Sequence, residues 1–164
     1  MSTLATRVKR VAYWATTGYV ALAMFIGGLS EVLDASMGIE FSSIGIATVV
    51  AVLGYPLYFV YITGIAKMLG AIAIIVPHFP RLKEWAYAGL TINMTGALLS
   101  WLIVTVIQNV AIPEGYGSAV FHVLNALHLI VLIIVSWLLR PKRRMLANLS
   151  PPESLRTRTN RSGG

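Results

Sequence analysis

Long uncharged, apolar runs alternate with short polar segments along the chain. Residues 11–30, 85–113 and 115–139 contain no Asp, Glu, Lys or Arg, and a fourth run at 41–76 is interrupted only by Lys67. A helix needs about 20 mostly apolar residues to cross the hydrocarbon core of a bilayer. The pattern therefore predicts an all-α bundle of four transmembrane helices, at about 11–31, 57–77, 85–108 and 118–139.

The apolar stretch at 41–54 is too short for a further span and is followed by Tyr55 and Pro56. Proline suits the first turn of a helix and disfavours a continuous one. We therefore expect a short interfacial or re-entrant helix before the second span, with an early extension of that span as the alternative. Strands are not expected, because no run alternates apolar and polar residues as a membrane barrel requires.

The basic residues gather on one side of a four-span chain. Three precede the first span, two lie at 78–84 and seven follow 139, which is twelve of the thirteen Lys and Arg residues. The other two connections contain only acidic charges. Because cytoplasmic loops carry the excess of Lys and Arg, both termini are predicted to lie in the cytoplasm. The first span is expected to be an uncleaved anchor in the inner (plasma) membrane.

Composition agrees with a membrane protein and excludes several other classes. The chain of 164 residues is 57% hydrophobic and 12% charged, and its mean hydropathy is +0.75. A soluble fold of this size could not hide so much apolar surface. The absence of cysteine excludes disulfides, thiol chemistry and thiolate metal sites. Residues 1–144 are expected to form the membrane domain and residues 145–164 a basic, disordered cytoplasmic tail that does not bind nucleic acid.

Residues 54–89 carry a motif that resembles the DoxX-like family of small, four-helix bacterial membrane proteins. Its matching parts are GYP at 54–56, Gly64 with Lys67 and LGA at 69–71, Pro77 with Pro80, and KEWAYAG at 83–89. The resemblance implies the four-span fold and a membrane location, and some relatives are linked to sulfur oxidation with quinone or to membrane oxidoreductases. Members often have a Ser-His pair late in the third span. Here that position reads Ser100–Trp101, so no histidine role is carried over.

Lys67 is the one cation inside an apolar run. It lies about ten residues, or ~15 Å, from the end of its span, close to the middle of a ~30 Å core. A lysine there costs roughly 2.5–3.5 kcal/mol on insertion scales, so it is expected to face the interior with a partner. Asn93 and His128 match its depth. Glu31 is a third possibility, although a straight first span would place it ~15 Å nearer the opposite surface.

A second polar group is expected in the outer half of the bundle. Glu31, His122 and Asn125 lie at comparable levels there, and Tyr55 begins the neighbouring span. Stripes of small residues, such as Gly89 and Gly96 at helical spacing, are interpreted as packing seams. The candidate ligand-binding residues are Glu31, Tyr55, Lys67, Asn93, His122 and Asn125.

The sequence shows no phosphate-binding loop, zinc motif or catalytic triad, and it predicts no catalytic or metal-binding residue. The leading hypothesis is a small membrane subunit, or a binder of an apolar, quinone-like ligand, associated with a redox system. Lys67 would orient the polar head group of that ligand. The alternatives are a structural or assembly partner of a larger membrane complex and a small oligomeric transporter. Expected partners are the lipid bilayer and either a second copy of the chain or a membrane oxidoreductase.

Overall fold

The structure, a computed structural model, describes residues 2–37, 52–77, 79–110, 112 and 118–140. These segments form four long helices, α1 (Ser2–Met37), α3 (Leu57–Ile75), α4 (Pro80–Leu102) and α5 (Ala119–Leu138). Each is long and apolar enough to span a membrane. The described residues contain no strand. The predicted all-helical, four-span architecture is therefore confirmed.

The helix boundaries follow from local chemistry. Pro56 precedes α3, and Pro80 occupies the first turn of α4, where the missing N–H costs nothing. The Ser118 side chain caps α5 by accepting a hydrogen bond of 3.2 Å from the Phe121 N–H. Beyond Leu102, α4 widens into a π-helical turn, η1 (Ile103–Ile107), and the chain then turns at Asn109, whose φ is +52°.

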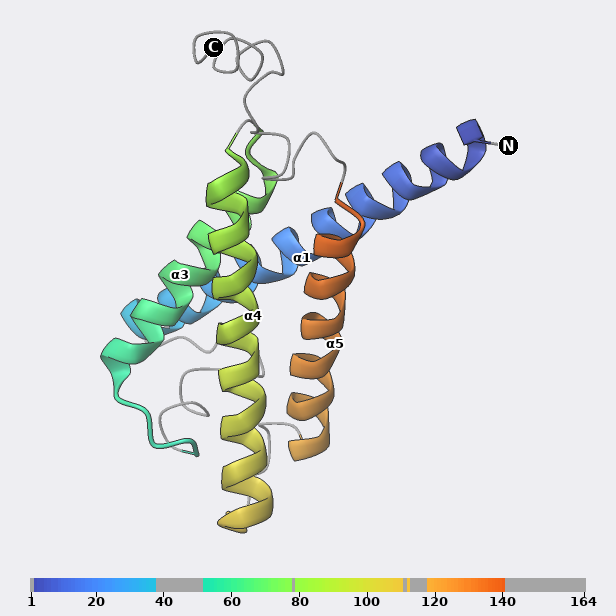
Figure 1. The fold of residues 1–164 in the computed structure, drawn as a ribbon. Coiled ribbons are helices and arrows are strands. Elements are labelled where there is room, and N and C mark those ends of the chain that lie inside the picture. The colour runs from blue at the N-terminus through green and yellow to red at the C-terminus, as the bar shows by residue number, and fades with distance from the viewer. Residues whose placement is uncertain (1, 38–51, 78, 111, 113–117, 141–164) are drawn as a thin grey trace, which may run out of the picture.

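Two helices are longer than the sequence predicted. α1 covers 36 residues rather than about 20 and crosses the bundle obliquely (Figure 1). α4 begins at Pro80 rather than near 85, so Lys83 and Glu84 belong to a helix and not to a loop. Hydropathy could not reveal either extension, because both add polar residues to the helix ends. Nearly all of the helix expected at 41–54, and the tail expected at 145–164, lie outside the described residues.

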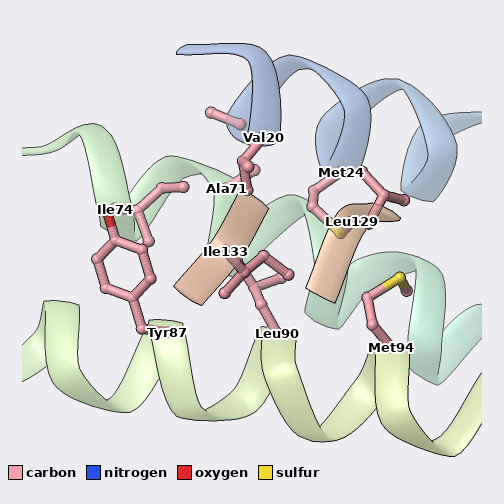
Figure 2. Close-up of a cluster of buried hydrophobic side chains, with 10 residues drawn as sticks. Val20, Met24, Ala71, Ile74, Tyr87, Leu90, Met94, Leu129 and Ile133 are labelled. Carbon is pink, nitrogen blue, oxygen red and sulfur yellow. The ribbon is translucent and has the colours of Figure 1, made fainter. Parts of the chain in front are cut away.

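One end of the bundle, called the basic end here, combines the start of α1, the end of α3, the start of α4 and the end of α5 (Figure 1). A buried apolar cluster joins all four helices in this half of the bundle. Figure 2 shows most of its side chains converging from the four ribbons. The cluster consists of Val20, Ala21, Met24, Ala71, Ile74, Tyr87, Leu90, Met94, Leu129 and Ile133. This core packs the four helices together in the half nearer the basic end. A second, smaller apolar cluster of Val52, Trp101 and Val104 lies in the opposite half.

Candidate functional site

A cavity of about 1020 Å³ lies among the helices and is lined by side chains from all four of them. Its wall is mostly apolar, which suits a membrane-soluble molecule rather than a hydrated one. All six candidate residues from the sequence line it, namely Glu31, Tyr55, Lys67, Asn93, His122 and Asn125. Side chains from four separate segments of the chain therefore line one cavity.

An ion pair between Lys67 and Glu31 forms part of the cavity wall. The Lys67 Nζ donates to the Glu31 carboxylate, and the two side chains are only 14% and 20% exposed. The Thr63 hydroxyl lies 3.5 Å from the second Glu31 oxygen. Within the described part of the chain, Lys67 makes no other hydrogen bond, so two of its three N–H donors are available to a ligand.

The ion pair corrects the depth expected for Glu31. The sequence placed Glu31 at the end of its span, nearer the outer membrane surface than Lys67. In the structure α1 continues from Glu31 to Met37, about 9 Å further along the helix axis, so Glu31 lies well inside the bundle. Of the three partners considered for Lys67, the structure therefore pairs Glu31 with it. His128 instead is exposed, with its ring centroid 5.6 Å from that of Tyr19.

Two glycines bring α1 and α3 close enough for this pair to form. A Cβ added to Gly28 would collide with the Gly64 carbonyl oxygen, and one added to Gly64 would lie 2.8 Å from the Gly28 carbonyl oxygen. Gly28 and Glu31 are one helical turn apart, as are Gly64 and Lys67. The backbone contact therefore sets the short distance that a lysine and a glutamate side chain must bridge.

A hydroxyl pair joins the start of α3 to α4 at the opposite end of the cavity. The Tyr55 and Ser100 hydroxyl oxygens are 2.7 Å apart. Ser100 donates to the Gly96 carbonyl oxygen at 2.8 Å, so its single proton is used and Tyr55 must be the donor between the two. This bond fixes the Tyr55 ring, which also stacks on Phe59 with 4.5 Å between ring centroids.

His122 is buried against an aromatic ring of the neighbouring helix. It is 3% exposed and stacks in parallel on Trp101, with 3.9 Å between ring centroids and 1° between the planes. This places an imidazole from α5 directly against Trp101 of α4. The sequence could not show this, because the two residues are 21 positions apart on different helices.

Two asparagines supply further hydrogen-bonding capacity. Asn93 and Asn125 both line the cavity, and neither side-chain amide has a hydrogen-bond partner among the described residues. Each amide offers two donors and one acceptor oxygen. Together with Lys67, they give the cavity several polar groups that can satisfy a carbonyl or hydroxyl of a bound molecule.

The glycines do not all act as packing seams. A Cβ added to Gly27, Gly89 or Gly96 would meet nothing within 4 Å, in contrast to Gly28 and Gly64. All three of these open glycines line the cavity. The seam predicted for the third span is therefore wrong at Gly89 and Gly96, because small residues there leave space rather than admit a neighbouring backbone.

A separate polar cluster lies at the basic end, away from the cavity. The Ser136 hydroxyl is 2.6 Å from that of Thr17 and 2.8 Å from that of Tyr87, and all three side chains are buried. These residues come from α5, α1 and α4, so one serine joins three helices. Sequence reasoning missed this cluster, because single hydroxyl residues in an apolar helix carry no signal of what they face.

Lys83 and Arg140, at the same end, are buried and bind protein groups rather than solvent. Lys83 is 1% exposed, and its Nζ donates to the Ile74 carbonyl oxygen at 2.6 Å, one of the last carbonyls of α3. The Arg140 guanidinium forms an ion pair with Glu84. The sequence treated Lys83 only as a loop cation, so its burial and capping role are new findings.

Among the described residues, no group of three or more His, Asp and Glu side chains could hold a metal ion. The lining contains one acidic and one basic side chain, and they neutralise each other. Trp101, Ser100 and Thr63 also line the cavity. Helical spacing places Thr63 and Ser100 on inner faces of their spans, but none of the three was among the predicted ligand-binding residues. They form contacts across helices that spacing along one helix cannot reveal.

Comparison with known proteins identifies the family to which the chain belongs. The family model described as the DoxX-like family matches residues 15–135, which include α3, α4 and most of α1 and α5. No curated protein and no solved structure matches the chain. The matched range includes all six candidate residues of the cavity.

Proposed function

We propose that this chain, which belongs to the DoxX-like family, is a multi-pass membrane protein that binds an apolar, quinone-like ligand. It would do so as a small subunit associated with a redox system. The observation that supports this most is the cavity of about 1020 Å³ with the Glu31–Lys67 pair in its wall. An apolar space with a few convergent polar groups is typical of small-molecule sites.

The charges of the cavity favour an uncharged ligand. Lys67 and Glu31 already neutralise each other, so an anionic or cationic head group would bring an uncompensated charge into a poorly hydrated site. A quinone carbonyl needs only hydrogen-bond donors. The two remaining Lys67 N–H groups and the Asn93 and Asn125 amides provide such donors on the same surface.

The proposed location is the inner membrane with both termini in the cytoplasm. The start of α1 carries exposed Arg7, Lys9 and Arg10, and Arg81 is exposed at the start of α4 at the same end of the bundle. A four-helix bundle brings both termini to one side, and the excess of basic residues assigns that side to the cytoplasm.

The direct test is binding of a chainless benzoquinone to the full chain in lipid nanodiscs. Saturable thermal stabilisation by the quinone is expected, since a ligand that binds only the folded state raises the apparent stability. The variant that combines Glu31→Gln with Lys67→Met should lose most of the effect, and the exposed control Arg81→Gln should keep it.

Two outcomes would overturn the proposal. If the quinone gives no saturable stabilisation of the wild-type protein, the ligand-binding role is wrong. If the double variant binds the quinone as tightly as wild type, the polar wall does not bind the head group. A stable partner complex recovered from membranes without retained quinone would then favour the assembly role.

A further inference from the structure

The cavity has a polar half and an apolar half. The ion pair, the Tyr55–Ser100 bond and His122 line the half away from the basic end. Towards the basic end, the lining between α3 and α4 is apolar and reaches Leu82 and Trp85 near the start of α4. The site therefore has the polarity of an amphiphile with one polar head and one apolar chain.

The apolar half is long. From Asn93 to Leu82 the apolar lining follows α4 for 11 residues, which corresponds to ~16 Å along the helix axis. Along the gap between α1 and α5, the lining from Ser30 to Tyr19 follows α1 for 11 residues, also ~16 Å. A chain that leaves the polar groups therefore has an apolar path of this length between α3 and α4, and the α1–α5 gap is the competing path.

Open space continues along this path. Gly89 and Gly96 are seven residues, or about two helical turns, apart on α4, and Asn93 lies between them. An added Cβ at either glycine meets nothing within 4 Å. Leu69 and Leu82, which also line this side, are exposed at the surface of the bundle. This side of the cavity, called the α3–α4 groove here, therefore has open space beside α4 and borders the region that lipid would occupy.

We propose that this α3–α4 groove is the subsite for the hydrocarbon chain of the ligand, which points from the polar half towards the basic end and Trp85. The inference rests on the proposed function and specifies its ligand as an uncharged amphiphile with an extended aliphatic or isoprenoid chain. It also makes the α3–α4 gap the side from which the ligand reaches the cavity from the bilayer.

The test is photolabelling of the full chain in nanodiscs with a benzoquinone that carries a decyl chain ending in a diazirine. Peptide mapping should find the label at 82–90 on α4, and excess chainless benzoquinone should compete it away. Gly89→Leu should reduce this labelling at least fivefold by filling the groove. Gly18→Leu is the matched control, because Gly18 also has nothing within 4 Å of an added Cβ but does not line the cavity.

The outcomes separate the chain subsite from the proposed function. Competed labelling at 19–26 on α1 would place the chain in the α1–α5 gap and overturn the inference while the head-group site stands. Competed labelling at 82–90 that Gly89→Leu does not reduce would also overturn it, because the chain would then bypass the groove. Labelling that the chainless quinone does not compete, at any position, would overturn both.

Discussion

Gly28 of α1 and Gly64 of α3 touch through their backbones, and each would lose this contact if the other carried a side chain. The contact lies one helical turn from the Glu31–Lys67 ion pair. Lipid offers helices little hydrophobic reason to associate, so close backbone approach is a main source of attraction between them. The two glycines therefore hold together the helix pair on which the polar wall of the cavity depends.

The first prediction concerns these glycines. Gly64→Ala should lower the thermal stability of the purified protein, because the new methyl group would lie 2.8 Å from a backbone oxygen and 2.9 Å from a Val32 methyl group. Overpacking of this kind costs about 1–3 kcal/mol. Thermal unfolding in a mild detergent, followed by circular dichroism, measures the change.

The control for this prediction is Gly89→Ala, where an added Cβ meets nothing. Alanine is the better helix former, so the unfolding temperature should stay the same or rise slightly. Equal losses of stability in the Gly64 and Gly89 variants would contradict the prediction, because the loss at Gly64 could then not be assigned to the backbone contact between α1 and α3.

The second prediction concerns the ion pair. Lys67→Met or Glu31→Gln alone should destabilise the protein more than the two changes together. The first change leaves the Glu31 carboxylate without a neutralising cation, and the second leaves the Lys67 ammonium without a neutralising anion. A coupling energy of about 1–3 kcal/mol is expected from a double-mutant cycle of unfolding free energies. Additive losses would argue against an interaction between these two side chains.

The third prediction concerns Ser136, which bonds to both Thr17 and Tyr87. Ser136→Ala should cost about 1–3 kcal/mol of unfolding free energy, because two buried hydroxyl groups lose a partner. The matched control is Thr91→Val, since that hydroxyl donates only to the Tyr87 carbonyl oxygen of its own helix. Similar losses in both variants would show that Ser136 does not join the three helices.

The fourth prediction concerns the end of α3. Lys83→Met should increase amide hydrogen exchange at 73–77, because Nζ no longer holds the carbonyl oxygens of Ala73 and Ile74. The exposed neighbour Arg81→Met should leave this exchange unchanged. Unchanged protection at 73–77 in the Lys83 variant would contradict the capping role.

The fifth prediction concerns orientation. The chain contains no cysteine, so single cysteines can report sidedness without further changes. Met37→Cys, at the exposed end of α1, should react with a membrane-impermeant maleimide on intact cells, whereas Arg81→Cys should react only after permeabilisation. The reverse pattern would invert the proposed topology, and equal reactivity would place both ends on one side.

The sequence predicted the spans well because hydropathy is a property of one helix at a time. The four helices contain the predicted ranges almost completely, although α1 and α4 continue through charged residues that the pattern placed outside the spans. The six candidate residues also meet at one cavity, since polar side chains in apolar helices avoid lipid and converge. Their roles in binding remain the proposals made above.

The sequence could not predict which residues meet across helices. Gly28 and Gly27 are neighbours with the same side chain, yet one touches a backbone and the other faces open space. The difference depends on the rotation and tilt of α1, which no local pattern encodes. The same limit hid the burial of Lys83 and the stacking of Trp101 on His122, because both need the partner helix to be placed first.

The length and slope of α1 connect the protein to the thickness of its bilayer. From Val11 to Met37 the helix measures ~40 Å, about 10 Å more than the ~30 Å hydrocarbon core, so an upright α1 would extend beyond the core and a tilted α1 would place more of its length inside it. A thicker membrane would let α1 stand more upright, whereas α3 and α5 are already close to the minimum crossing length. Hydrophobic mismatch would therefore act first on the angle between α1 and its neighbours, and through Glu31 on the shape of the cavity.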